Sequence, residues 1–189
     1  DCRVMAISGR NHRQNYGQLS DGYLWSRYPH SWGWATWRRA WRHYDDELST
    51  FCFSSAEHRL KEILQNKSIA KAWAWHFSKI QRNDASLTAW DYRWMWALFH
   101  QGGFVALPRS NLVRNIGFGP DATHTVRSSN QSEPKEKVGS FCGPINHLCP
   151  SFYDPEYDWW LANNVHFIQP KGLFTRVKAH IKKQLRFWK

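Results

Sequence analysis

Ten of the thirteen tryptophans of this 189-residue chain lie between Trp25 and Trp96, and this clustering restricts the fold more than any other feature. A tryptophan ring is largely buried in a folded protein, while its indole N–H still needs a hydrogen-bond partner. So many rings in one stretch require either an unusually aromatic core or a surface that stacks on flat ligands such as sugar rings. The densest run is Trp32-Gly33-Trp34-Ala35-Thr36-Trp37, and Trp41 follows it closely.

Hydrophobic periodicity predicts four helices across this region. Trp34, Trp37 and Trp41 recur at helical spacing, which predicts a helix with an aromatic face. The segment Thr88-Ala89-Trp90-Asp91 has the Ser/Thr-x-x-acid pattern that opens helices, with Thr88 as the cap. Gly102-Gly103 is expected to end that last helix. The predicted helices cover residues 34–43, 55–65, 68–81 and 88–101.

The strands predicted from the sequence are few and short. Apolar and small residues before Gly9 predict a largely buried strand over 4–8, and Phe104-Val105-Ala106-Leu107 predicts a second strand that ends at Pro108. Residues 10–24 are polar and are expected to form a loop. The polar, Pro-containing stretch 127–140 is expected to be a loop or linker. The pattern as a whole predicts a helix-rich α/β chain.

The charge and composition narrow the classes of protein to consider. The net charge is +11 and the mean hydropathy is −0.68, and no apolar run approaches the roughly 20 residues of a membrane-spanning helix. The four cysteines show no CxxC or paired metal spacing, so reduced thiols in a cytoplasmic protein are expected. Basic charge with interleaved aromatics also suits nucleic acids, but no zinc-knuckle, RNP-like or helix-turn-helix signature occurs, so we expect no nucleic-acid partner.

The C-terminal tail carries much of the excess charge. Residues 171–189 contain seven Lys or Arg and no Asp or Glu. Within them, Leu173, Val177, Ile181, Leu185 and Trp188 fall along one helical face. A basic amphipathic helix of this kind lies on anionic membranes, which predicts peripheral docking on an inner membrane face. An ordinary terminal helix that packs on its own domain explains the same pattern.

Asp91 is the strongest candidate for a catalytic residue. A carboxylate at a helix start, flanked by Trp90 and Trp94, is placed for partial desolvation, and a desolvated carboxylate can act as a general base. The alternative is a structural acid that completes a capping box at the third helical position and complements the helix dipole. The two roles are compatible.

A second candidate is the polar segment 115–125, which contains Gly117, Gly119, Asp121 and His124. Such a loop can close over phosphates, and the His124 imidazole can bind a metal. A plain surface loop with a solvated histidine is the alternative.

Several long motifs in order resemble the C-terminal half of bacterial nucleotide-diphospho-sugar transferases, which are glycosyltransferases of the GT-A type, some of them described as HlpA-like. The resemblance rests on the segments 28–41, Trp90-Asp91-Tyr92-Arg93-Trp94, 108–119 and 121–125. It covers residues 3–125. The Gly-Trp segment and the acid-bearing helix also look like the acceptor side of inverting N-acetylglucosaminyltransferases.

The resemblance implies the C-terminal part of a GT-A fold, incomplete at the N-terminus. The Asp-x-Asp motif that holds a divalent metal, Mn or Mg, would lie upstream of residue 1, so the chain alone is expected to be inactive. The implied organisation is the acceptor-side half of the domain over 1–126, the linker over 127–140, and an extension with the basic helix over 141–189.

The implied activity is transfer of a sugar from a nucleotide-diphosphate donor to a glycan or lipid-linked acceptor, with inversion and with Asp91 as general base. The expected acceptor-binding residues are Trp32, Gly33, Trp34, Trp90 and Trp94. Gly117, Gly119 and His124 are expected at the donor diphosphate, with His124 near the metal. The alternative from another class is a non-catalytic module that binds carbohydrate or a membrane surface.

Overall fold

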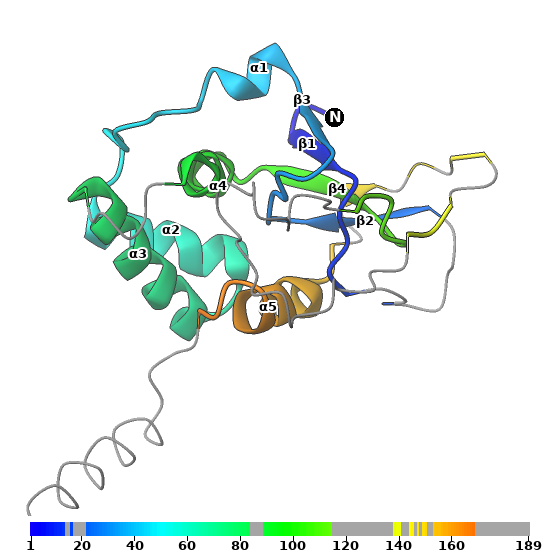
Figure 1. Ribbon diagram of the computed structural model, residues 1–189. Coiled ribbons are helices and arrows are strands. Elements are labelled where there is room, and N and C mark those ends of the chain that lie inside the picture. The colour runs from blue at the N-terminus through cyan, green and yellow to red at the C-terminus, as the bar shows by residue number, and fades with distance from the viewer. Residues whose placement is uncertain are drawn as a thin grey trace, which may run out of the picture.

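The computed structural model describes residues 1–13, 16, 22–83, 89–114, 138–140, 144–145, 147, 149–150 and 153–168. Within them the chain is a mixed α/β protein, with the small sheet on the right in Figure 1 and α2, α3 and α4 on the left. The helices are α1 (Arg38–Trp41), α2 (Phe53–Leu64), α3 (Lys67–Gln81), α4 (Trp90–Gln101) and α5 (Pro155–Asn164). The strands are β1 (Val4–Ser8), β2 (Tyr23–Ser26), β3 (Trp34–Thr36) and β4 (Phe104–Pro108).

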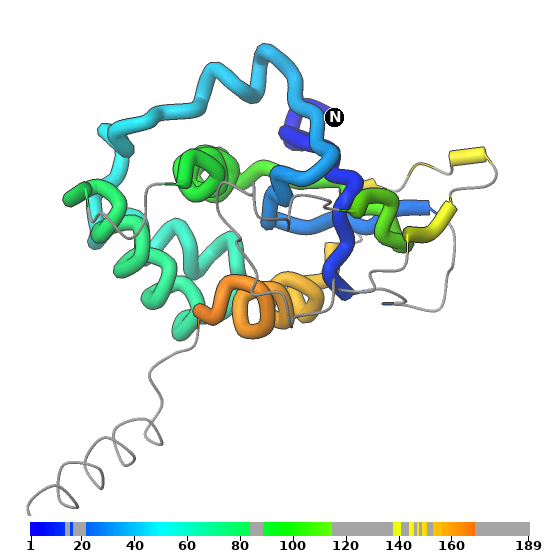
Figure 2. The backbone as a smooth tube through the Cα atoms, in the orientation of Figure 1, coloured from blue at the N-terminus to red at the C-terminus, as the bar shows by residue number. Residues whose placement is uncertain are grey.

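The sheet has the strand order β2-β4-β1-β3. Its two central strands, β1 and β4, are parallel, and the edge strands β3 and β2 pair antiparallel to β1 and β4. Parallel neighbours need a crossover connection, and here the chain from β1 to β4 passes through β2, β3 and the helices α1 to α4. Figure 2 shows the part of this connection where the chain leaves α1 and arches over to α2.

The helix predicted over 34–43 is wrong in its first half. Trp34, Ala35 and Thr36 form β3, opposite Ser8, Ile7 and Ala6 of β1. The Thr36 Oγ1 donates to the Met5 carbonyl over 2.6 Å, and only the four residues of α1 are helical. The three-to-four spacing of the tryptophans fits a helix, but the backbone hydrogen bonds offered by the edge of β1 favour the extended form.

Two further elements were not expected. The end of the predicted loop 10–24 enters β2, whose Leu24, Trp25 and Ser26 are all buried and so show no alternation. Helix α5 begins in a region without a clear pattern, although Pro155 at its first turn and Asp154 as its cap are ordinary helix-start signals. The predictions for β1, α2, α3, α4 and β4 are confirmed to within about two residues.

One core joins the sheet to the helices. Buried residues from β1, β2 and β4 and from α2 to α5 belong to a single cluster, whose largest members include Trp73, Tyr28, Phe77, Phe99 and Tyr157. The indole N–H of Trp73 donates to the Tyr28 hydroxyl over 2.8 Å, so this buried ring keeps its polar atom satisfied. Part of the aromatic content is therefore core, while Trp32, Trp37, Trp41, Trp75 and Trp90 are exposed.

Helix α5 is tied to the sheet through one buried carboxylate. Asp158 is fully buried and accepts hydrogen bonds from the Ser26 hydroxyl (2.5 Å), the Arg27 backbone N–H (2.8 Å) and the Tyr153 hydroxyl (2.9 Å). The residues of α5 fall in the predicted extension 141–189, yet they belong to the same core as the sheet. Of the predicted linker 127–140, only 138–140 are described, and the tail 171–189 lies outside the described residues.

Crossing a bilayer requires a helix that is both long and apolar. Within the described part of the chain, no helix meets both requirements.

Candidate functional site

Asp91 is the second residue of α4, not the third. The residue before the helix is Ala89, and within the described residues no side chain caps this helix start. The predicted capping box has Thr88 as its cap, and Thr88 lies outside the described residues; the N-cap position falls on Ala89. The carboxylate of Asp91 remains in the first turn, where the free backbone N–H groups favour a negative charge.

The surroundings of Asp91 are more apolar than those of an ordinary helix-start acid. It lines a narrow crevice with Trp34, Trp94, Val105 and Pro29 among its neighbours. Its Oδ1 is buried and has no hydrogen-bond partner among the described residues. Burial raises the pKa of the Asp91 carboxyl, while the backbone N–H groups at the helix start and the Ser31 hydroxyl oppose that shift. No local sequence pattern predicts a role for Ser31, which approaches Asp91 from a distant segment of the chain.

A cluster of aromatic rings lies beside Asp91. The Trp34 ring centroid is 5.4 Å from that of Trp90 and 6.1 Å from that of Trp94. The Trp41 ring lies 5.1 Å from Trp94 and stacks on Tyr44 with centroids 4.5 Å apart. We call these five residues the tryptophan cluster. It draws rings from β3, α1, α4 and the segment after α1 to one place.

The members of the tryptophan cluster differ in exposure, and this separates ligand-facing rings from supporting ones. Trp90 is 41% exposed and Trp41 is 38% exposed, whereas Trp94 is only 1% exposed. Trp94 can therefore support the neighbouring rings but offers almost no surface of its own. Trp41 was not expected as a site residue, and its spacing from Trp34 in the sequence was the available signal.

Trp32 and Gly33 precede β3 and lie at the turn into that strand. The Arg10 guanidinium lies over the Trp32 ring, 4.9 Å from its centroid. Gly33 has a φ of +59°, and a Cβ there would meet the Val113 Cγ1 at 2.4 Å. Its carbonyl also accepts from the Gly9 N–H over 2.7 Å. Gly33 is thus needed for the turn and for close packing, whatever else it contacts.

One histidine lines the crevice, and two more histidine rings lie close to it. His30, which lines it, is buried, and its ring centroid is 4.6 Å from His12 and 6.5 Å from His166. Burial lowers the pKa of His30 well below its usual value and lowers that of His166 to about 3, so both rings are neutral at pH 7. Neutral rings add no positive charge that would lower the pKa of Asp91.

The donor side of the predicted site is not described. Gly117, Gly119 and His124 all lie outside the described residues. Among the residues that the structure does describe, no group of three or more His, Cys, Asp or Glu side chains is placed to hold a metal. These residues therefore do not provide a ligand set for the Mn or Mg ion that the resemblance implies.

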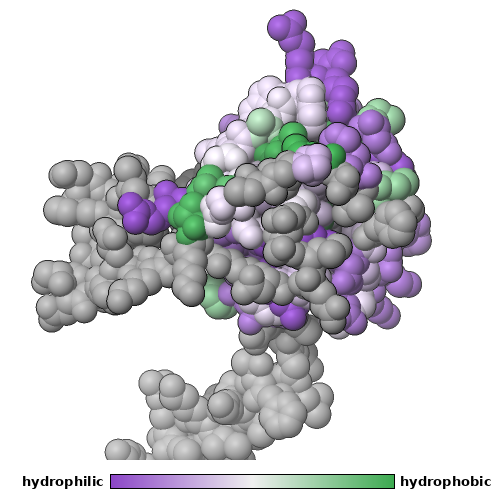
Figure 3. All heavy atoms as spheres, turned by 90° about the vertical axis from the view of Figure 1, so that its right-hand side faces the viewer, coloured by the Kyte–Doolittle hydropathy of each residue, from purple (hydrophilic) through white to green (hydrophobic). Residues whose placement is uncertain are grey.

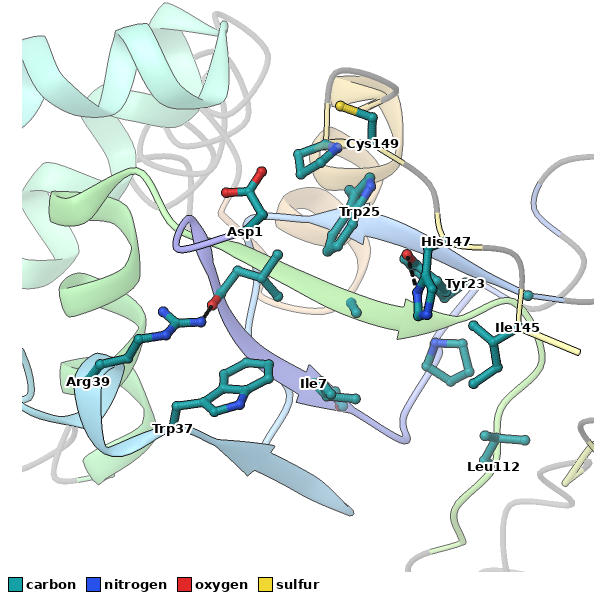
Figure 4. Close-up of a pocket in the computed structure, with 16 residues that line it drawn as sticks. Asp1, Ile7, Tyr23, Trp25, Trp37, Arg39, Leu112, Ile145, His147 and Cys149 are labelled. Atoms are coloured by element: carbon teal, nitrogen blue, oxygen red, sulfur yellow. Dashed lines mark hydrogen bonds between the residues drawn. The ribbon is translucent and has the colours of Figure 1, made fainter.

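A larger hollow of about 1010 Å³ opens on a face of the sheet (Figure 4). Its lining is mostly apolar, with Ile7, Trp25 and Trp37 on the strands and beside them. At one end the Arg39 guanidinium donates to the Cys2 and Val4 carbonyls over 2.8 and 2.7 Å. At the other end Tyr23 and His147 lie in contact, with 3.5 Å between the hydroxyl and Nδ1. Among the described residues that line this hollow, none is a desolvated acid like Asp91, so we do not take the hollow as the candidate catalytic site.

Figure 3 views the side of the molecule that lies to the right in Figure 1, where apolar residues are set among hydrophilic ones.

Comparison with known proteins adds no family for the site. No protein-family model matches the chain, and neither the curated proteins nor the solved structures contain a match.

Proposed function

We propose that this chain is the acceptor side of a glycosyltransferase that uses a nucleotide-diphosphate sugar. The observation that carries the proposal is Asp91, a carboxylate in the first turn of α4 with a raised pKa and a buried oxygen that lacks a partner among the described residues. A buried oxygen without a hydrogen-bond partner costs stability, and groups with shifted pKa values concentrate at functional sites. The resemblance of the surrounding motifs to sugar-nucleotide transferases supplies the reaction class.

In the proposed reaction Asp91 acts as a general base. Its carboxylate takes the proton of an acceptor hydroxyl as the acceptor oxygen forms a bond to the anomeric carbon of the donor sugar. The bond from that carbon to the diphosphate oxygen breaks on the opposite side, so the configuration inverts and a nucleoside diphosphate leaves. A carboxylate whose pKa is raised by burial is a stronger base than an exposed one. Because Oδ1 is buried, side chains that line the crevice must move to admit the acceptor.

The tryptophan cluster is proposed to bind the acceptor glycan. The exposed rings of Trp90 and Trp41 offer apolar faces beside Asp91, and sugar rings present apolar C–H faces that stack on such surfaces. Trp34 and Trp94 hold these rings in place from behind. A glycan or a lipid-linked glycan fits this arrangement.

The donor side of the proposal rests on the resemblance. It comprises the nucleotide-diphosphate sugar, a divalent ion (Mn or Mg), and Gly117, Gly119 and His124 near the diphosphate. A cytoplasmic enzyme that docks on the inner membrane face would meet both a nucleotide-sugar donor and a lipid-linked acceptor. The proposal names no nucleic-acid partner.

The test is turnover in the longest natural form of the protein that contains these residues. Asp91→Asn should lower kcat by about a hundredfold or more, which is the effect expected for loss of a general base. Donor and acceptor binding should change little. Glu156→Gln is the matched control, because Glu156 is an exposed carboxylate in the first turn of another helix, α5.

Two results would contradict the proposal in different ways. Turnover within a few-fold of wild type in Asp91→Asn would remove the general-base role. Glycan binding that needs Trp90, in a natural protein without transferase activity, would instead identify a carbohydrate-binding module. Trp90→Ala should weaken acceptor binding roughly three- to tenfold, since one stacked ring contributes about 0.5–1.5 kcal/mol.

A further inference from the structure

The outer face of α3 is basic and has an exposed tryptophan at its centre. The helix contains Lys67, Lys71 and Lys79 and no Asp or Glu. Trp75 is 46% exposed and lies four residues from both Lys71 and Lys79, so the three side chains share one face. The Lys79 Nζ lies 4.1 Å from the centroid of the Trp75 ring. Cationic and aromatic groups thus form one continuous patch, which we call the α3 patch.

Packing fixes the orientation of this patch. Ile69, Trp73, Phe77 and Ile80 on the opposite side of α3 are buried in the core. The Asn66 side chain caps the helix by accepting from the Ser68 and Ile69 N–H groups, both over 3.1 Å. The helix therefore cannot turn to bury Trp75 without exposing the core. Figure 1 shows α3 at the edge of the molecule, on the side away from the sheet.

The positive charge extends past the end of the helix. The Arg82 guanidinium donates to the Ser78 hydroxyl over 3.2 Å, and Ser78 in turn donates to the Trp75 carbonyl over 2.7 Å. This chain of contacts holds Arg82 on the same side as Trp75.

Basic residues outnumber acids on α3 and the helix packed against it. Helix α2 packs against α3, and its Glu62 pairs with His58 at 3.3 Å and with Arg59 at 3.6 Å. Together the two helices contain five Lys or Arg and two Glu, Glu57 and Glu62.

We infer that the α3 patch docks the folded domain on an anionic lipid bilayer, with Trp75 at the headgroup level and the Lys ammonium groups against lipid phosphates. An indole ring is apolar with one polar edge, and it prefers the boundary between headgroups and acyl chains. Basic residues on one helix face add attraction to anionic lipids. The α3 patch has a single exposed ring on a convex helix, which suits contact with a bilayer. Proteins that bind single-stranded nucleic acids instead use grooves lined by several stacking rings.

This inference does not depend on the proposed transferase activity, and it concerns residues other than the basic tail 171–189. The experiment uses the full chain and needs no turnover, so the two proposals can fail separately. Co-sedimentation is measured with vesicles of phosphatidylglycerol mixed with phosphatidylcholine, and with vesicles of phosphatidylcholine alone. Salt is raised in steps, because screening weakens electrostatic attachment.

The decisive variants are Lys71→Gln, Lys79→Gln and Trp75→Ala. Each Lys→Gln change should weaken binding to the anionic vesicles about fivefold, the effect expected for one basic residue near an anionic surface. Trp75→Ala should weaken binding even at high salt, because its contribution is apolar. Arg38→Gln is the matched control, since it removes one exposed charge on α1, which lies apart from α3 (Figure 1). All four variants should unfold at the wild-type temperature.

Three outcomes would overturn the inference. Equal binding by the α3 variants and wild type would place attachment elsewhere, in the tail for example. Equal binding to vesicles of phosphatidylcholine alone would remove the role of lipid charge. Binding to single-stranded DNA that is lost in the same variants, without binding to anionic vesicles, would make the α3 patch a nucleic-acid surface.

Discussion

Two aspartates in this protein occupy similar local positions and have opposite surroundings. Asp91 lies in the first turn of α4 and Asp158 lies in the first turns of α5. Burial raises the pKa of both carboxyls, that of Asp158 to about 6. Asp158 is satisfied by Ser26, Arg27 and Tyr153, whereas Oδ1 of Asp91 lacks a partner among the described residues. The sequence around each gives little hint of this difference.

The contrast separates an acid that supports the fold from the acid that we propose to act in catalysis. Three donors around Asp158 offset the loss of hydration and tie α5 to β2, so the group holds the fold together. The unsatisfied oxygen of Asp91 costs stability and has no donor among the described residues to offset that cost. In the proposed function, the acceptor hydroxyl would complete this hydrogen bond. The two carboxyls therefore differ in hydrogen-bond saturation and in exposure, since Asp158 is fully buried and Asp91 only partly.

The largest expected effect is on stability, at Asp158. Asp158→Ala should lower the free energy of unfolding by about 3–5 kcal/mol, because three donors lose a charged acceptor in a buried place. Urea unfolding followed by circular dichroism measures the change. Asp154→Ala on the same helix is the control, and loss of this exposed cap should cost about 1 kcal/mol. Equal losses at the two positions would contradict the structural role of Asp158.

Local patterns predicted most of the helices but not the contacts of these two acids. The apolar spacing of Leu60, Ile63 and Leu64 in α2 was sufficient to place that helix, since one face of it is buried. The same reasoning placed Trp34 in a helix and was wrong, because strand pairing with β1 is a long-range term that periodicity does not contain. Short-range spacing thus predicts elements better than it predicts which edge they join.

The candidate site was predicted only in part for the same reason. Asp91 and Trp90 are adjacent in the sequence, so their motif could be recognised. Ser31 lies before β3 and Trp41 ends α1, about fifty residues or more from Asp91 in the sequence. Only the folded chain brings them to the site, so no local pattern links them to Asp91. The supporting role of Trp94 follows from its 1% exposure, which depends on the packed neighbours.

The second expected effect is a pH dependence carried by Asp158. Its pKa is about 6 in the fold and 3.8 in the reference state, so the fold binds this proton more tightly than the unfolded chain. This tighter proton binding by Asp158 stabilises the fold fully below pH 3.8, and the stabilisation is lost as the pH rises through 6. Wild type should therefore lose about 2–3 kcal/mol relative to Asp158→Asn between pH 4 and 7, at about 1.4 kcal/mol per pKa unit.

The stability of wild type must be compared with that of Asp158→Asn at each pH, because buried histidines make the fold more stable as the pH rises. His166 has its pKa lowered to about 3, so its contribution is present above pH 6.5 and is lost as the pH falls toward 3. The difference between wild type and Asp158→Asn cancels this term. A difference that stays constant from pH 4 to 7 would mean that Asp158 titrates as it does in the unfolded chain.

The smallest expected effect is on stability, at Asp91. Asp91→Asn should change the free energy of unfolding by less than about 1 kcal/mol, and in the stabilising direction at pH 7, because it removes a buried charge that the described residues leave partly unsatisfied. Urea unfolding of this variant beside wild type is the measurement. Enzymes commonly gain stability when a strained catalytic group is replaced, whereas a structural acid behaves in the opposite way. A loss as large as that of Asp158→Ala would mean that Asp91 supports the fold through contacts comparable to those of Asp158, and the distinction between the two aspartates would fail.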